Sequence, residues 1–233
     1  MEKYDKKGDV SYTLGTTLTF ELMLRKPEVA RKIYVNPKQK RDETYEKMRL
    51  LAEKQHVPFI TNNQKIFSLS EKDNVMMIGE FQKFQTETVP SGNHVVLVNP
   101  SNQGNLGTIF RSSAAFSIDF LAIIRPAADA FDPKCVRSSM GAIFSVPFAY
   151  FPSFEAYQAL AGDRHYYPFM LQCSTPLHTI EKLAPYSLIF GNEATGLPDS
   201  FLSIGTPVRI EQSSQVDSLN LDNAVSIGVY AFR

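Results

Sequence analysis

The sequence of 233 residues lacks several features that would assign it quickly to a class of protein. Its two cysteines, Cys135 and Cys173, cannot build a disulfide framework or a four-thiolate zinc site. Its four histidines have no metal-ligand spacing, so we predict no metal site. No apolar run approaches the ~18 residues that cross a bilayer, and the charged opening MEKYDKKGDV lacks the apolar segment of a secretory signal. We therefore expect a cytoplasmic chain without membrane contact.

An overall excess of charge of one sign is also missing, because 24 Lys and Arg residues balance 24 Asp and Glu residues. Residues 1–90 nevertheless carry a small basic excess, and residues 91–233 carry a small acidic one. If the protein binds a polyanion, the first part is the expected source of affinity. The candidate phosphate contacts there are the basic groups Arg25–Lys26, Arg31–Lys32, Lys38, Lys40 and Arg41.

What is present is an ordinary globular composition, 43% hydrophobic and 21% charged, which excludes disorder and low-complexity repeats. Residues 1–85 alternate short strands with helix-prone runs and predict a small α/β domain. The polar stretch 86–93, TETVPSGN, predicts a linker. Strand–helix alternation over residues 94–233 predicts a second α/β domain with a mostly parallel sheet covered by helices. Expected strands include Phe169–Gln172 and Pro207–Ile210, and the last helix is expected over Leu219–Phe232.

The first of three motifs rich in glycine and asparagine is Asn99–Arg111, NPSNQGNLGTIFR, which follows the predicted strand His94–Val98 and opens a helix. Gly104 and Gly107 permit tight backbone geometry, and the free amides of the helix start favour an anion. The motif lacks the third glycine of a dinucleotide fingerprint, which argues against a nicotinamide-dependent oxidoreductase. Taken alone, the segment fits a capped helix with a surface arginine equally well.

The other two motifs also follow predicted strands. Leu188–Pro198, LIFGNEATGLP, holds one carboxylate, Glu193, in a turn flanked by glycines. In Arg209–Phe232 a polar loop leads to SLN, where Ser218 is the predicted N-cap of the last helix. Each motif alone fits an ordinary loop or cap. Together they lie at the carboxyl ends of strands, where open α/β sheets bind ligands, and so indicate a common site.

The three motifs, in this order, resemble those of SpoU/TrmH-type RNA 2′-O-ribose methyltransferases of the SPOUT class. NQGNLGTIFR, FGNEATGLP and DSLNLDNAVSIGVYAF resemble the first, second and third motifs, and DPKCVRSSMGAIFSVP resembles the segment between the first two. The resemblance implies a trefoil-knotted, mostly parallel sheet in a methyltransferase domain over residues 94–233. It also implies a smaller N-terminal α/β substrate-binding domain over residues 1–85, and homodimers with active sites at the interface.

The activity that the resemblance implies is S-adenosylmethionine-dependent 2′-O-ribose methylation of RNA. Ribosomal RNA is the expected substrate and tRNA the alternative; a non-catalytic RNA-binding member of the same fold is a further alternative. The resemblance places S-adenosylmethionine against backbone groups of Gly191, Ile210 and Leu219. It assigns the chemistry to Arg111, Asn105, Glu193, Ser218 and Asn220.

The family role of Arg111 is to hold the phosphate of the target nucleotide and to help remove the 2′-proton. A guanidinium keeps its proton at neutral pH, and its forked donors match a phosphate, so the phosphate clamp is the favoured role. The chain departs from the family pattern beside the cofactor loop. Ala194 stands where many members have glycine, and Glu211–Gln212 replace a frequent Pro-Met pair.

Overall fold

The computed structural model describes residues 4–70, 74–173 and 175–233. Its contacts divide the chain into two compact units, which we describe separately. The first unit joins the N-terminal part, up to Phe84, with the later segment Asp129–Ser145. The second unit comprises Gln85–Ala128 and Val146–Arg233. The sequence prediction differs here, because it assigned residues 129–145 to the second domain.

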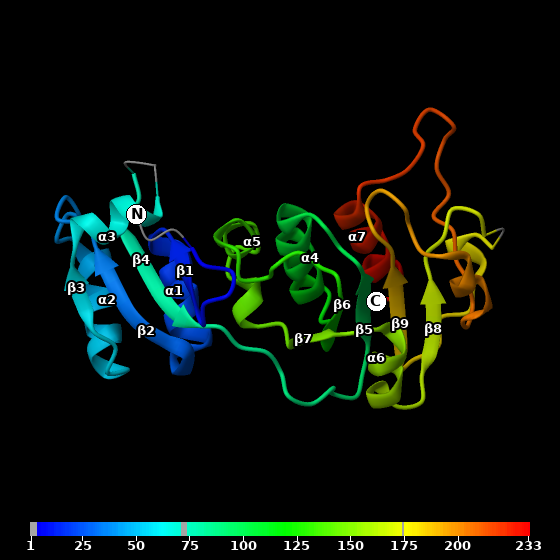
Figure 1. Ribbon diagram of the computed structural model, residues 1–233, viewed down its shortest axis with the longest axis horizontal. Coiled ribbons are helices and arrows are strands. Elements are labelled where there is room, and N and C mark those ends of the chain that lie inside the picture. Colours follow the sequence, from blue (N-terminus) through cyan, green and yellow to red (C-terminus); the bar gives the residue numbers. More distant parts are fainter. Residues whose placement is uncertain (1–3, 71–73, 174) are drawn as a thin grey trace. The chain divides into compact units, whose positions relative to one another are not determined.

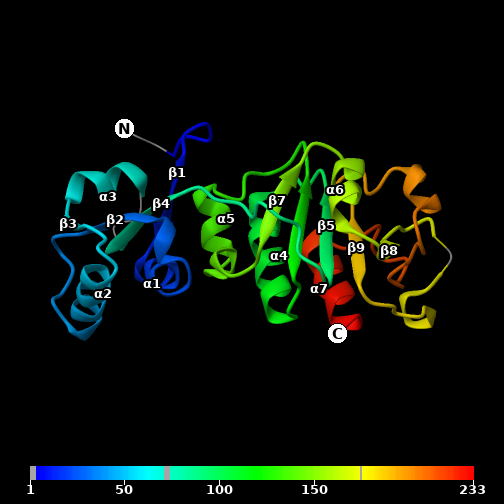
Figure 2. The same cartoon turned by 90° about the horizontal axis from the view of Figure 1, so that it is seen from below.

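The first unit is built on a sheet with helices on both faces (Figure 2). In the described residues its strands follow the order β1-β4-β2-β3, and only the β2–β3 pair is parallel. Its elements are β1 Val10–Leu14, α1 Thr16–Arg25, β2 Ala30–Val35, α2 Glu43–Lys54, β3 Phe59–Thr61, α3 Asn63–Leu69, β4 Met77–Gln82 and α5 Pro133–Ser138.

Apolar side chains hold the helices of the first unit on the two faces of its sheet. Met23 of α1 and Met48 of α2 meet Met77 in one core cluster, whereas Ile66 of α3 packs in a second cluster with Ile78. Successive residues of a strand point to opposite faces of the sheet. Met77 therefore packs in the cluster on one face, and its neighbour Ile78 packs in the cluster on the other face. These helices therefore cover both faces, as Figure 2 shows.

The segment Asp129–Ser145 belongs to the first unit because of specific contacts with it. The Ser11 hydroxyl donates to the carbonyl of Phe131. The rings of Phe81 and Phe144 meet edge to face with centroids 5.2 Å apart, and those of Phe84 and Phe131 do so at 5.4 Å. Aromatic pairs of this geometry contribute beyond the area they bury. The two sections of the first unit thus share one aromatic core.

The second unit is a parallel sheet, which confirms the predicted α/β class (Figure 1). Its strands have the order β7-β6-β5-β9-β8, and all of their described pairings are parallel. Its elements are β5 His94–Val98, α4 Gln103–Ala115, β6 Phe120–Ile124, β7 Phe148–Phe151, α6 Phe154–Ala161, β8 His165–Pro168, β9 Tyr186–Phe190 and α7 Leu221–Ala231.

Helices cover both faces of this sheet as well. Tyr157 of α6 packs with Phe151 in the cluster on one face. On the other face Phe110 of α4 contacts Phe148, with ring centroids 5.1 Å apart. Helix α7 packs against α4 and β9. Burial on both faces requires apolar runs in the central strands, and HVVLV and FLAII are buried throughout.

Three sequence expectations for the second unit need correction or refinement. Strand β8 ends at Pro168, so residues 169–172 do not form the predicted strand. Residues 207–210 contribute only isolated bridges, from Val208 to Phe169 and from Arg209 to Pro176. The predicted linker is attached to the second unit, where the Thr86 amide donates to the Phe148 carbonyl at 2.8 Å.

In the described part of the chain no helix has the length and hydropathy to span a bilayer.

A buried polar network closes the amino-terminal ends of the strands of the second unit. The Nε2 atom of His94 lies 2.9 Å from the Pro90 carbonyl, which can only accept, so Nε2 carries the proton. Nδ1 accepts from the Tyr157 hydroxyl at 2.7 Å, and that hydroxyl lies 2.6 Å from the Ser187 hydroxyl. Burial, together with the nearby charge of Arg164, lowers the pKa of His94 to about 4. His94 is therefore neutral at pH 7.

This low pKa makes the stability of the fold depend on pH. The unfolded chain binds a proton at His94 near pH 6.5, before the folded chain does, so stability falls as the pH drops below that value. Between pH 7 and pH 5 we expect His94 to contribute a loss of about 2 kcal/mol in the free energy of unfolding. Urea denaturation of the wild type and of His94→Gln measures the difference. Equal losses in the two proteins over this range would refute the assignment.

Candidate functional site

The site is built where β5 and β9 end at the same edge of the parallel sheet. The backbone of Asn99, just after β5, is left-handed with φ 55°. Its carbonyl accepts from Nδ2 of Asn192 at 2.7 Å. The Oδ1 atom of Asn192 accepts from the amide of Ala194 at 2.8 Å, which shapes the turn after β9. Asn192 therefore fixes the β9 turn against the β5 loop, a role that the sequence analysis missed.

Glu193 is the centre of the polar contacts at this edge. One carboxylate oxygen accepts from the amide of Ser101 at 2.9 Å and from its hydroxyl at 2.8 Å. The other accepts from the amide of Asn102 at 3.0 Å and from Nδ2 of Asn105 at 3.2 Å. Burial alone would raise the pKa of Glu193, but the hydrogen bonds from Ser101 and Asn102 outweigh it and lower the pKa. Glu193 is thus an ionised acceptor that ties the β9 turn to the start of α4, where the helix dipole favours its charge.

Asn105 and Asn220 form a reciprocal amide pair between the starts of α4 and α7. Nδ2 of Asn105 donates to Oδ1 of Asn220 at 3.2 Å, and the reverse bond measures 3.3 Å. Oδ1 of Asn220 also accepts from the Leu221 amide at 3.1 Å, which makes Asn220 the N-cap of α7. The prediction of Ser218 as the N-cap was wrong, because the helix begins at Leu221. The structure thus joins Asn105, Glu193 and Asn220 in one cluster.

A cavity of about 360 Å³ lies beside this cluster. The predicted cofactor residues Gly191, Ile210 and Leu219 all line it, as do Glu193 and Ser218. Its further lining includes Phe169, Phe190, Leu197, Gln212, Leu221 and Ala224. Ligand pockets in proteins commonly have this size and combine apolar walls with a few polar groups. Residues 210, 212 and 217–219 form one side of the cavity, and they belong to a loop that was partly expected as a strand.

Arg111 lies apart from the cluster. It is exposed on α4, six residues beyond Asn105, which corresponds to about 9 Å along the helix axis and a different side of the helix. Within residues 4–70, 74–173 and 175–233, its side chain has no hydrogen-bond or ion-pair partner. The cavity lining does not include it either. Of the five predicted catalytic residues, the single chain therefore leaves Arg111 outside the site.

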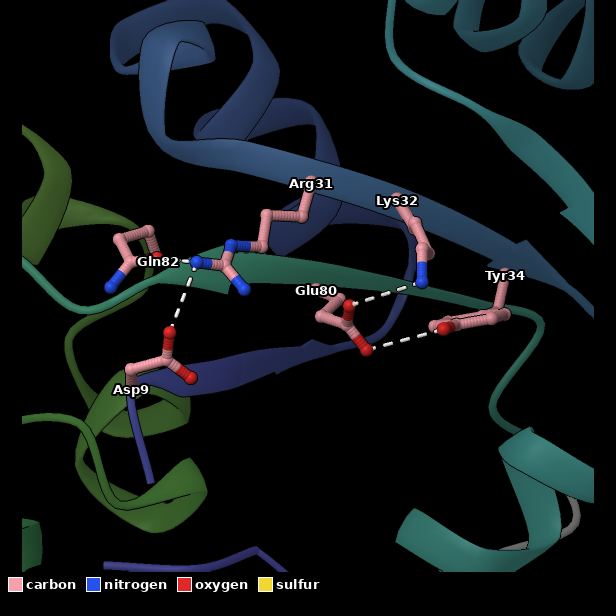
Figure 3. A network of polar contacts seen from close by, with 6 residues as sticks. All are labelled: Asp9, Arg31, Lys32, Tyr34, Glu80 and Gln82. Atoms are coloured by element: carbon pink, nitrogen blue, oxygen red, sulfur yellow. Dashed lines mark hydrogen bonds and ion pairs between the residues drawn. The ribbon is translucent and has the colours of Figure 1, made fainter. Parts of the chain in front are cut away.

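Several of the predicted phosphate contacts in the first unit are occupied by internal partners. Figure 3 shows Arg31 bound to Asp9 and Gln82, and Lys32 beside Glu80. The ion pairs measure 3.1 Å for Arg31–Asp9 and 4.0 Å for Lys32–Glu80. A paired cation is less available to a nucleic acid, so these two residues are weaker candidates than the sequence predicted.

Of the remaining predicted phosphate contacts in the first unit, some have ion-pair partners and others do not. Arg25 pairs with Glu21, and Lys26 pairs with Glu28 at 3.3 Å. Three basic side chains between β2 and α2 stay exposed, with no ion pair in the described part of the chain: Lys38, Lys40 and Arg41. This short segment retains the free positive charge that a phosphate backbone requires.

Comparison with known proteins assigns the family. The sequence profile of the SpoU rRNA Methylase family matches residues 92–230. The 23S rRNA (guanosine(2553)-2′-O)-methyltransferase RlmP of Bacillus subtilis is 26% identical over 179 residues, which cover 75% of this chain and 72% of that protein.

Solved structures agree with this assignment. An AdoMet-bound rRNA methyltransferase from Sinorhizobium meliloti superposes with a TM-score of 0.81 at 25% identity, over 97% of this chain and 87% of the other. A structure concerned with 2-OH methylation of C/U34 on tRNA superposes with a TM-score of 0.57 at 29% identity, over 61% of this chain and 95% of the other. Residues 92–230, which the family profile matches, contain the whole Asn105–Glu193–Asn220 cluster and its cavity. The chain belongs to the SpoU rRNA methylase family.

Proposed function

We propose that this RNA methyltransferase transfers a methyl group from S-adenosylmethionine to a ribose 2′-hydroxyl of rRNA. The observation that carries the proposal is the cluster of Asn105, Glu193 and Asn220 at the edge of a cavity lined by Gly191 and Ile210. The relative from Bacillus subtilis, which methylates 23S rRNA at a 2′-oxygen, supports the choice of rRNA. The similarity to a structure concerned with tRNA methylation keeps tRNA as the second candidate.

The residues of the cavity fit S-adenosylmethionine. Gly191 lacks a side chain where a Cβ would overlap the backbone of Gly196, so the β9 turn closes tightly around the space. Backbone groups of Gly191, Ile210 and Leu219 would hold the cofactor, and the apolar walls from Phe190 and Leu221 suit a flat base. When bound, S-adenosylmethionine supplies a methyl group that its sulfonium already activates.

The protein then has to position the ribose rather than activate the methyl group. Ionised Glu193 is saturated with hydrogen bonds, so we assign it the role of holding Asn105 and the start of α4 in place. Asn105, Asn220 and Ser218 would orient the ribose; of these, Ser218 lines the cavity, and the other two belong to the cluster beside it. Arg111 holds the phosphate of the target nucleotide with its forked donors.

A homodimer is part of this proposal, because Arg111 lies away from the cluster of its own chain. A second copy would bring its Arg111 to the site. Exposed apolar side chains on α7 support such an interface: Ile227 is 39% exposed and Tyr230 is 51% exposed. Tyr230 also contacts Phe116 at the end of α4, with ring centroids 5.8 Å apart. Burying such a patch between two copies is favourable.

Two further features belong to the proposal. The first unit would bind RNA, with Lys38, Lys40 and Arg41 as phosphate contacts. The second unit would contain the trefoil knot that the family resemblance implies. In support of the knot, the turn after β9 and the loop before α7 line one cavity.

Mapping of 2′-O-methylation across total RNA tests the proposed function. We expect cells that lack the gene to lose methylation at a ribose of rRNA, and to regain it with the wild-type gene. A gene carrying Arg111→Ala should not restore it. Loss at a tRNA nucleotide would select the second candidate, and an unchanged methylation profile would contradict the enzymatic proposal.

A further inference from the structure

Arg125 is an exposed cation at the carboxyl edge of the parallel sheet, directly after β6. Its guanidinium carbon lies 4.3 Å from the centroid of the Tyr150 ring. In the part of the chain that the structure describes, its side chain has no hydrogen bond and no ion pair. A cation–π contact occupies no N–H donor, so the forked donors of Arg125 remain available to an anion.

The Tyr150 ring under this cation is itself held in place. Its hydroxyl donates to the Ala128 carbonyl at 2.9 Å, and its ring centroid lies 6.3 Å from that of Phe148. A cation that rests on a fixed ring has fewer orientations than one surrounded by water, so it loses less conformational entropy when it binds a ligand. Arg125 is thus a preorganised group of hydrogen-bond donors.

Arg125 and the start of α4 are on the same side of the sheet. Tyr150 and Phe148 lie two residues apart in β7, so their side chains share one face of the sheet. This is the face that α4 covers, because Phe110 of α4 contacts Phe148. The ring under Arg125 therefore lies on the side of the sheet that carries Asn105 in the first turn of α4.

The segment after β6 is also bonded to the loop that holds Glu193. The Ala128 amide donates to the Pro100 carbonyl at 2.6 Å, and the next residue, Ser101, donates to Glu193. Neighbouring strands lie about 4.8 Å apart, so the end of β6 is about 10 Å from the end of β9, two strands away. Neighbouring nucleotides of one RNA strand can reach both places.

We propose that Arg125 binds a backbone phosphate of the RNA strand next to the target nucleotide, an inference that rests on the proposed function. The target ribose would lie at the Asn105–Glu193–Asn220 cluster, and the forked donors of Arg125 match the oxygens of the adjacent phosphate. The lining of the cofactor cavity does not include Arg125. As a phosphate contact, Arg125 contributes to RNA affinity and to the placement of the strand, and it does not read the base sequence.

Arg125→Gln removes the charge at an exposed position. With total rRNA from cells that lack the gene as the methyl acceptor, we expect the KM for RNA to rise about tenfold and kcat to stay within about twofold of the wild type. The affinity for a labelled oligouridylate, measured by fluorescence anisotropy, should fall by a similar factor. Its salt dependence should also weaken, by about 0.7 in the slope of log affinity against log salt concentration.

Lys182→Gln is the matched control. Lys182 is also exposed, and its Nζ lies 6.0 Å from the centroid of the Phe232 ring, but it precedes β9 and so lies toward the opposite edge of the sheet. Its substitution removes the same charge and should leave KM, kcat and the oligouridylate affinity unchanged. An equal loss in the two variants would show a general effect of charge and would overturn the proposal.

Substitutions of Tyr150 test whether the ring acts through Arg125. Tyr150→Leu removes the ring and should weaken oligouridylate binding about threefold, whereas Tyr150→Phe removes only the hydroxyl and should bind like the wild type. In the double variant with Arg125→Gln, Tyr150→Leu should cause no further loss, because coupled residues are not additive. Additive losses would contradict the preorganisation of Arg125 by the ring.

The failure of this inference is distinguishable from the failure of the proposed function. Unchanged RNA affinity and salt dependence in Arg125→Gln, or a fall in kcat without a rise in KM, overturns the phosphate contact alone. If the wild type binds RNA but transfers no methyl group, the proposed function is wrong, and the affinity of Arg125→Gln still decides the contact. A wild type that does not bind RNA contradicts both.

Discussion

Arg111→Ala is expected to reduce methyl transfer to RNA by about 10²–10³-fold while the affinity for S-adenosylhomocysteine stays unchanged. The expected effect is large because one guanidinium would supply both forked donors to the phosphate that positions the ribose. Cofactor affinity should be preserved because the cavity lining does not include Arg111. Transfer of a radioactive methyl group to RNA measures the first quantity, and calorimetry measures the second.

Arg111→Lys is the conservative control and should recover only part of the activity, because an ammonium is a point charge without the fork. Shared sites in the proposed dimer allow a sharper test. A mixture of Arg111→Ala chains with chains that cannot bind the cofactor should form heterodimers with one intact site and regain activity. Absence of recovery would contradict sharing of the site between two copies, and loss of cofactor affinity in Arg111→Ala would contradict the assigned role.

Gly191→Ala is expected to abolish binding of S-adenosylhomocysteine and to lower the free energy of unfolding by about 1–3 kcal/mol. A Cβ at this position would lie under 3.0 Å from backbone atoms of Gly196 and Leu197, which cannot move without shifting the whole turn. That turn carries Glu193, so its displacement would also disturb the contacts with Ser101. Calorimetry and urea denaturation measure the two effects.

Gly162→Ala is the control that separates the steric overlap expected in Gly191→Ala from the effect of replacing a glycine elsewhere in the fold. Gly162 follows α6 with φ +71°, and a Cβ there would meet nothing within 4 Å. Its substitution should destabilise the fold only through backbone strain, by about 1–2 kcal/mol, and should leave cofactor affinity unchanged. If Gly191→Ala bound S-adenosylhomocysteine normally, the cavity beside the β9 turn would not be the cofactor site.

The elements that the sequence predicted best are those whose apolar residues are contiguous. The central strand β5 has the predicted bounds His94–Val98, because both faces of a parallel sheet are buried and the run HVVLV shows it. Strand β1 was not predicted, since its sequence VSYTL contains Ser11 and Thr13. Both are buried in the structure, with their hydroxyls bonded to the Phe131 carbonyl and to Thr19. The Phe131 carbonyl lies 120 residues from Ser11, so this pairing leaves no local pattern in the sequence.

The candidate site was predictable to a similar degree. The order of the three motifs brought Glu193 and Asn220 to one edge of the sheet, and the structure joins them through Asn105. The donors that hold Glu193 could not be foreseen, because Ser101 lies 92 residues away in sequence. The helical spacing of Arg111 to Asn105 places the two residues on different sides of α4.

The assignment of Asp129–Ser145 to the first unit has a consequence for how this chain can be divided. The polypeptide crosses between the units three times, after Phe84, after Ala128 and after Ser145. A single proteolytic cut in residues 85–93 would break the covalent link of residues 1–84 to the rest of the chain, but their contacts with Asp129–Ser145, which stays joined to the second unit, would remain. A truncated gene that starts at residue 94 would encode Phe131 and Phe144 without their aromatic partners, so neither unit can be excised cleanly. A substitution at Phe81 would have to be accommodated by Phe144, in a stretch of sequence that interrupts the second unit.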